Sequence, residues 1–150
     1  MSPEAQLPTG KRVLYKCIFE LVESLNLTAS VRFPGYIDSN DLPLWYNATA
    51  LFVYPSHFEG FGLPVLEAMA CGAPVITSDV SSLPEVTGRE GAARLVNPTD
   101  PAALAAALAE VMSDAELRAA MSSQGQTRAA EFRWEKTARE TVAVYQKALT

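Results

Sequence analysis

The sequence has few of the residues on which disulfide-rich and metal-binding proteins depend. Its 150 residues include two cysteines, Cys17 and Cys71, and one histidine, His57. Two cysteines so far apart form neither a disulfide framework nor the spacing of a zinc site. We therefore expect two reduced and partly buried thiols, as is usual in a cytoplasmic protein, and no metal.

Positive charge and long apolar runs are also scarce. The formal net charge of -5 argues against a nucleic-acid partner, because such a partner requires a basic face. Glu67 and Asp79 interrupt the best candidate for a membrane span before it reaches the ~20 residues that a span needs. Residues 1–10 contain two prolines and no apolar segment of the kind found in signal peptides. The sequence thus predicts a cytoplasmic protein without a membrane span.

What is present is the composition of one globular domain. About half of the residues, 49%, are apolar, and no segment is repetitive. A chain of this length can bury roughly 68–70% of its extended-chain surface. We expect an irregular leader over residues 1–10 and a single domain over residues 11–150.

Hydrophobic periodicity predicts alternating strands and helices in the middle of the chain. The short apolar runs at 51–54 and 74–77 are typical of strands buried on both faces of a parallel sheet. A helix is expected between them, over 63–71, and Gly72 follows it as a typical residue after a helix end. This alternation indicates an α/β fold.

The flanking segments are predicted mainly as helices. Residues 11–26 fit either a strand or a helix, and we favour a helix over 14–25. Asp41 and Asp100 are expected to cap helices that have a proline in the first turn. Ser113 with Glu116 matches a capping box. The remaining expected elements are strands at 31–33 and 93–96, a turn or short helix at 82–86, and a final helix at 134–149.

The glycine-rich stretch before the central helix is the first candidate for a ligand site. Gly60 and Gly62 flank Phe61 directly before the helix. Glycines allow a ligand to approach the main chain, and a helix N-terminus offers unpaired N–H groups. This combination can cradle a phosphate or sugar hydroxyls. The alternative is a plain strand-to-helix turn.

Two carboxylates accompany this turn. Glu67 follows Leu63 by four residues and lies on or beside the apolar stripe of the helix, where it needs donors such as ribose hydroxyls. Glu59 lies on the loop at the carboxyl end of a strand, where ligands of open α/β sheets bind. For each the alternative is a solvated carboxylate. His57 could serve as a general base, but we expect a structural or rim role, since nothing nearby in sequence orients it.

At this point the sequence resembles a known family. Residues 59–78, EGFGLPVLEAMACGAPVITS, resemble the donor-binding signature of the group 1 (family 4) retaining glycosyltransferases of GT-B fold, with the Glu-x7-Glu motif at Glu59 and Glu67. The resemblance extends through 33–36, 42–46, 51–56, 82–86 and 134–145. It implies the C-terminal donor-binding domain, with a Rossmann-like, mostly parallel sheet, helices on both faces and a helical C-terminal tail.

The resemblance also implies a reaction and roles for residues. Such enzymes transfer a sugar from a nucleotide-sugar to an acceptor with retention, and without a metal. Glu59 is implied as the catalytic-site carboxylate on the donor sugar, and Glu67 as the ligand of the ribose hydroxyls. The loop at 34–36 is implied to lie near the base. The residues implied to offer backbone N–H groups to sugar and phosphates are Gly60, Phe61, Gly62 and Leu63.

Parts of the family pattern are missing from this sequence. Family members have an N-terminal acceptor domain, and their C-terminal domain opens with two strands, the first carrying an Arg and a Lys that hold the diphosphate. Neither the domain nor these cations are recognised here, and no Lys or Arg lies between Arg32 and Arg89. The sheet would then have a gap between the strands at 31–33 and 51–54. The strands could close up, the leader could supply a strand, or a second copy could form a homodimer.

Two functions follow from these features. The first is the nucleotide-sugar-binding domain of a glycosyltransferase. We expect this domain to have no turnover alone, because transfer needs donor and acceptor held between two lobes. The alternative is a non-catalytic remnant that acts as an oligomerisation or interaction module. The base, the sugar and the acceptor are not specified by the sequence.

Overall fold

The computed structural model describes the backbone of residues 9–88 and 91–149. The chain divides into two compact units, with the boundary between Asp38 and Ser39. The predicted leader over residues 1–10 lies outside the described residues, apart from its last two, which open helix α1. The single domain expected over residues 11–150 stays a prediction.

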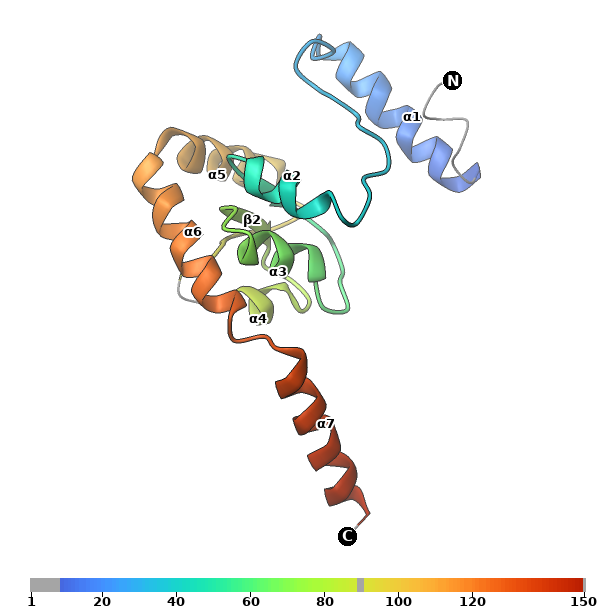
Figure 1. The fold of residues 1–150 in the computed structure, drawn as a ribbon. Coiled ribbons are helices and arrows are strands. Elements are labelled where there is room, and N and C mark those ends of the chain that lie inside the picture. Colours follow the sequence, from blue (N-terminus) through green and yellow to red (C-terminus); the bar gives the residue numbers. More distant parts are fainter. Residues whose placement is uncertain (1–8, 89–90, 150) are drawn as a thin grey trace. The chain divides into compact units, whose positions relative to one another are not determined.

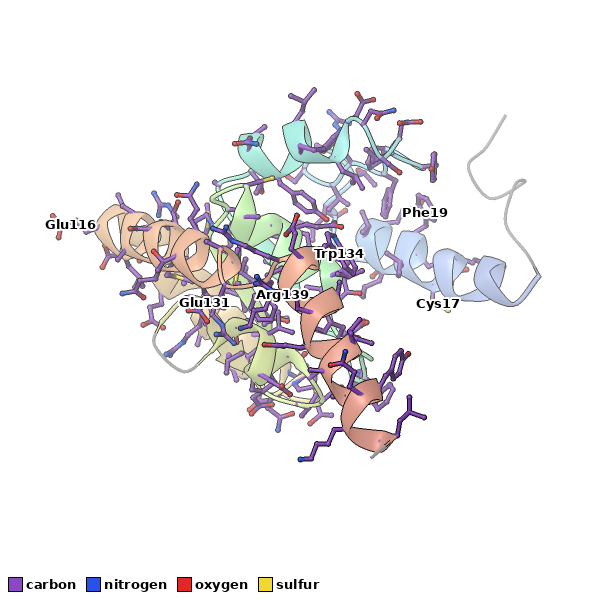
Figure 2. All side chains as sticks on the ribbon, turned by 60° about the horizontal axis from the view of Figure 1, so that its bottom comes forward. Cys17, Phe19, Glu116, Glu131, Trp134 and Arg139 are labelled. Carbon is purple, nitrogen blue, oxygen red and sulfur yellow. The ribbon has the colours of Figure 1, made fainter. Side chains whose placement is uncertain are left out.

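The first unit is built on helix α1 (Thr9–Ser24), which confirms the helix expected over 14–25. The strand expected at 31–33 is wrong, because these residues pair with no strand in the described part of the chain. Phe33 packs its ring on Phe19 of α1 instead, with the ring centroids 4.2 Å apart. Cys17 is exposed, contrary to expectation (Figure 2), whereas Cys71 of the second unit is half-buried as expected.

The second unit contains a parallel sheet in the order β1-β2-β3. Its strands are β1 (Phe52–Tyr54), β2 (Val75–Ser78) and β3 (Arg94–Val96). Tyr54 lies opposite Thr77, and Thr77 opposite Leu95, so all three strands end at the same edge. The three predicted strands in this unit are confirmed to within one or two residues, and so is the α/β fold class.

Helices cover both faces of this sheet (Figure 1). Because side chains alternate along a strand, Val75 and Ile76 of β2 enter different apolar clusters. The cluster around Val75 takes residues from α2 (Leu42–Ala48), α3 (Leu63–Ala70) and α4 (Leu83–Thr87). The cluster around Ile76 takes residues from α5 (Pro101–Ser113) and α6 (Ala115–Ala129). Figure 1 shows α6 running beside α3, where Gly125 allows close packing on Met69.

The helix starts agree only in part with the predicted caps. Asp100 caps α5 as expected, since its Oδ1 accepts a hydrogen bond of 2.9 Å from Ala103 N–H. The capping box at Ser113 is wrong: Ser113 is the last residue of α5, and Asp114 caps α6 by accepting from Leu117 N–H at 2.9 Å. Asp41 stands at the start of α2, but its side chain makes no capping bond.

The final helix, α7 (Trp134–Ala148), is present as predicted but contains no buried residue. Its apolar side chains are exposed, including Trp134, which is labelled in Figure 2. The residues whose spacing places them on one face of this helix and its C-terminal end, Ala138, Val142, Tyr145 and Leu149, are exposed as well. No helix among the described residues is long and apolar enough to cross a membrane.

Candidate functional site

The site lies where two loops leave the carboxyl edge of the sheet. One loop, residues 55–62, connects β1 to α3, and the other, residues 79–82, connects β2 to α4. Because β1 and β2 are neighbouring parallel strands, both loops begin at the same edge. Ligands of open α/β sheets bind at this edge, and Glu59 lies on the first of these loops, whereas Glu67 lies on the helix that follows it.

The two loops are joined by serine hydroxyls. Ser81 Oγ accepts a hydrogen bond from Glu59 N–H at 3.1 Å and donates one to the Glu59 carbonyl at 2.5 Å. Ser82 Oγ donates to the Phe61 carbonyl at 2.9 Å. Ser81 has a positive φ of 60°, which is uncommon for a residue other than glycine. We call these contacts the serine clasp; they fix the main chain around Glu59.

The carboxylate of Glu59 is held by two further hydroxyls. Its Oε1 accepts hydrogen bonds of 2.8 Å from both Ser56 Oγ and Tyr54 Oη. The bond from Ser56, followed by that from Tyr54, lowers the pKa of Glu59, because both stabilise the ionised form. The same bond to Glu59 raises the pKa of Tyr54, with burial as a further cause. Glu59 is therefore an ionised hydrogen-bond acceptor.

Glu67 lies on the exposed side of α3. The buried side chains of this helix are Val65, Ala68 and Met69, so the expected stripe through Leu63 and Glu67 is wrong. Helical spacing places Val65, Ala68 and Met69 on the face opposite to Leu63 and Glu67, and the face with Val65, Ala68 and Met69 is the buried one.

A buried tyrosine supports the Glu67 carboxylate. Tyr46 Oη of α2 donates a hydrogen bond to Glu67 Oε2 at 3.2 Å. Burial and then the charge of Glu67 raise the pKa of Tyr46 to about 12. At neutral pH the phenol is thus a donor, and Glu67 keeps acceptor capacity for a second partner on its exposed side.

The two glycines of the turn occupy structurally different positions. Gly62 precedes α3 with φ 102°, and a Cβ there would stand 2.6 Å from Leu83 Cδ2, so the fold requires glycine. A Cβ at Gly60 would meet nothing within 4 Å, and its φ is not in the positive range. The main chain at Gly60 therefore borders open space.

The phenylalanine between these glycines is anchored from the end of α6. Phe61 is 41% exposed, and its ring meets that of Phe132 edge-on with centroids 5.8 Å apart. Arg128 lies 4.8 Å over the Phe132 ring and donates to the carbonyls of Glu85 and Val86 on α4, at 2.6 and 3.0 Å. Arg128 is also paired with Glu131, so it is occupied with protein acceptors.

The other predicted parts of the site make no contact with these two carboxylates that the structure shows in the described part of the chain. His57 is exposed, and no hydrogen bond or ion pair is recorded for it among the described residues. The loop at 34–36 belongs to the first unit, so its place near a base stays a prediction. Within the described residues, no group of three or more His, Cys, Asp or Glu could hold a metal ion.

Sequence reasoning identified both carboxylates but missed the side chains that hold them. Tyr46 and Ser81 lie 21 and 22 residues from their partners, Glu67 and Glu59. No local spacing rule links residues so far apart. The available signal was the parallel sheet itself, because it brings the loops after β1 and β2 to one edge.

Known proteins are similar to this chain in sequence and in fold. The sequence pattern of the family described as glycosyl transferases group 1 matches residues 9–128. The chain is 41% identical to O-antigen chain mannosyltransferase B of Escherichia coli over 128 residues, which cover 85% of this chain and 33% of that protein. It spans only 15–33% of the length of the curated relatives that it matches.

Solved structures agree with the sequence matches. The crystal structure of the C-terminal domain of a glycosyl transferase group 1 family protein (LpcC) from Francisella tularensis is 33% identical, with a TM-score of 0.75. The match covers 83% of this chain and 64% of that one. Anabaena Alr3699/HepE in complex with UDP-glucose is 25% identical with a TM-score of 0.81, over 93% of this chain and 38% of that one.

Proposed function

The chain belongs to the group 1 glycosyl transferases and corresponds to their C-terminal GT-B domain, and on this premise we propose that it binds a nucleotide-sugar donor. In the proposed complex Glu59 accepts hydrogen bonds from hydroxyls of the sugar, and Glu67 accepts from the ribose hydroxyls. The main chain of Gly60, Phe61, Gly62 and Leu63 offers N–H groups to the sugar and phosphates. The full protein would transfer the sugar with retention and without a metal.

The observation that carries this proposal is the pair of supported but accessible carboxylates. Tyr46 bonds one oxygen of Glu67, and Tyr54 and Ser56 bond one oxygen of Glu59. An ionised carboxylate has about four lone-pair sites, so each glutamate retains acceptor capacity. Sugar and ribose hydroxyls are donors, and a vicinal pair matches the remaining capacity of Glu67.

The negative charge of the site bears on how a diphosphate could be bound. A diphosphate at the glycine turn would meet two glutamates and the positive end of α3, which compensates only in part. Arg128, the nearby cation on α6, is engaged with α4 carbonyls and Glu131. We therefore propose that cations from outside the second unit complete the phosphate site, and that the chain alone has no turnover.

Nucleotide binding is the direct test. The chain is titrated with UDP, GDP, UDP-glucose and GDP-mannose while the amide signals of residues 59–67 are followed by NMR. We expect weak binding with shifts in this segment, and loss of binding in Glu67→Gln, because the amide cannot provide the same acceptors to the ribose. Glu116→Gln, an exposed change on α6, serves as the control and should bind as wild type. An absence of shifts at millimolar nucleotide would reject the proposal.

A second function, an interaction module without nucleotide affinity, is favoured by one observation. The outer edge of β1 pairs with no other strand in the described part of the chain. An unpaired edge can take a strand from another chain, which is the route to the homodimer considered above. This function predicts a dimer by light scattering and no effect of Glu67→Gln on any property. A monomer at high concentration would exclude the homodimer.

A further inference from the structure

The Glu59 carboxylate has an asymmetric environment. Both hydroxyls that reach it, Tyr54 Oη and Ser56 Oγ, donate to the same oxygen, Oε1, at 2.8 Å. For the other oxygen, Oε2, no donor is recorded among the described residues. Two bonds to one oxygen restrict the rotation of the carboxylate, so Oε2 has a fixed direction although nothing in the described residues bonds it.

The main chain of Glu59 is held independently of its side chain. The hydroxyl of Ser81 bonds both the N–H and the carbonyl of Glu59, and so forms a closed pair of hydrogen bonds between two loops. Ser81 adopts a positive φ of 60° to make this contact. A non-glycine residue in this conformation carries strain that persists only where the surroundings impose it.

We infer that Tyr54, Ser56 and Ser81 are positioning residues for Glu59: they occupy its Oε1 and its main-chain groups, and they leave Oε2 to accept a hydrogen bond from a hydroxyl of the donor sugar. This inference rests on the proposed function and deepens it. It assigns the recognition of the sugar, as distinct from the nucleotide, to a three-hydroxyl support that comes from β1, the loop after it and the loop after β2.

The geometry makes a specific demand on the ligand. Tyr54 and Ser56 stabilise the ionised carboxylate, so Oε2 accepts and does not donate. It can therefore recognise a hydroxyl, and it repels a group that carries only acceptors. Preorganisation matters because a carboxylate fixed before binding does not lose rotational freedom when the sugar arrives. Removing the support should weaken binding of the sugar moiety while the nucleotide moiety binds as before.

Four variants and one control separate the effect of the hydroxyls from that of the packing. Tyr54→Phe keeps the ring, which stacks on Phe52 with centroids 6.0 Å apart, and removes only the hydroxyl. Ser56→Ala removes the second donor. Ser81→Gly removes the Ser81 hydroxyl and leaves the bond of 3.1 Å from Ser82 Oγ to the Glu59 carbonyl. Glycine adopts the positive φ without strain, so this variant should fold. Ser81→Ala removes the same hydroxyl but keeps the strained conformation, and Tyr145→Phe on exposed α7 is the control.

The first readout needs no ligand. The pKa of the Glu59 carboxyl is measured by carbon-detected NMR titration in the wild-type chain and in each variant. Tyr54→Phe and Ser56→Ala should each move this pKa upward toward the ordinary value of a glutamate, whereas Tyr145→Phe should leave it unchanged. An unaltered Glu59 titration in both Tyr54→Phe and Ser56→Ala would overturn the hydrogen-bonded support.

The second readout compares a nucleotide with its sugar conjugate. Affinities for UDP and UDP-glucose, and for GDP and GDP-mannose, are measured by calorimetry. We expect each support variant to lose about three- to tenfold in affinity for the sugar nucleotide that binds wild type, the order of one hydrogen bond. Affinity for the free nucleotide should stay within twofold, and both Ser81 variants should behave alike if the hydroxyl, not the strain, is responsible.

The outcomes distinguish the two proposals. If the wild-type protein binds no nucleotide, the proposed function is overturned and, with it, the assignment of Oε2 to the sugar. The Glu59 titration still tests whether Tyr54 and Ser56 hold the carboxylate. Wild-type protein that binds a sugar nucleotide, with variants that bind it equally well, overturns only the inference. Variants that lose the sugar nucleotide and the free nucleotide to the same extent also overturn it, since that result indicates a general disturbance of the loop.

Discussion

Helices α3 and α7 were predicted from the same kind of apolar spacing, but the structure gives them opposite environments. In α3, a helix of 8 residues, Val65, Ala68 and Met69 are all 0% exposed. In α7, a helix of 15 residues, none is buried, and Trp134 and Tyr145 are 79% and 65% exposed. Spacing of apolar residues therefore predicts that a helix forms, but the burial of its face depends on a partner that spacing does not identify.

The contrast also concerns function. Helix α3 is packed between the sheet and α6, so its exposed face, with Glu67, stands on a rigid base. A carboxylate on such a base keeps its direction when a ligand arrives. Helix α7 has no comparable support among the described residues, and none of the proposed donor contacts depends on it.

The largest effect should come from removing a buried side chain of α3. Met69→Ala empties space at a 0% exposed position that contacts both the sheet and α6, and we expect a loss of about 2–5 kcal/mol in the free energy of unfolding. Urea unfolding followed by circular dichroism measures it. Leu149→Ala, just beyond α7, is the matched control and should change stability by less than about 0.5 kcal/mol. Similar losses in both variants would contradict the contrast between the helices.

The next largest effect is expected at Gly62, the residue directly before α3. Gly62→Ala places a Cβ 2.6 Å from Leu83 Cδ2 at a positive φ, so we expect a loss of about 1–3 kcal/mol in unfolding free energy. Gly60→Ala meets no protein atom and should be neutral or stabilising by up to about 1 kcal/mol.

Nucleotide titration then completes the comparison of the two glycines. If a donor approaches the main chain at Gly60, the added methyl group weakens binding although the fold is intact. A Gly60→Ala variant that is stable and binds nucleotide normally would show that Gly60 borders solvent alone.

A smaller effect is expected at the tyrosine that supports Glu67. Tyr46→Phe removes the hydrogen bond to Glu67 and should cost about 1 kcal/mol near neutral pH. Because folding raises the pKa of Tyr46 from 10.0 to about 12, its contribution is fully present below pH 10 and is lost as the pH rises toward 12. In measurements from pH 8 to 12, the unfolding free energy should therefore fall faster above pH 10 for wild type than for the variant, so the advantage that wild type has near neutral pH disappears before pH 12. Parallel curves would show that Tyr46 ionises normally.

These sites show how far the sequence alone reaches. The strands at 51–54 and 74–77 were predicted closely because each is a continuous apolar run bounded by turn residues. Glu59 and Glu67 were identified because they belong to one contiguous motif. Ser81 and Tyr46 could not be found this way, since their bonds join residues more than 20 positions apart. The strand at 31–33 was wrong because a strand also requires a neighbour with which to pair.

The smallest effect should come from α7, and it tests what the exposed face is for. Tyr145→Ser and Val142→Ser replace side chains that are 65% and 52% exposed, so each should change the unfolding free energy of this chain by less than about 0.5 kcal/mol. The same substitutions reduce the apolar area of a helix that buries none of its residues. If either variant loses more than 1 kcal/mol, or alters the mass of the particle in light scattering, the face is covered in solution by another part of the protein or by a second copy. Unchanged stability and mass would instead confirm that burial of α3, and not the amphipathic pattern shared with α7, holds this unit together.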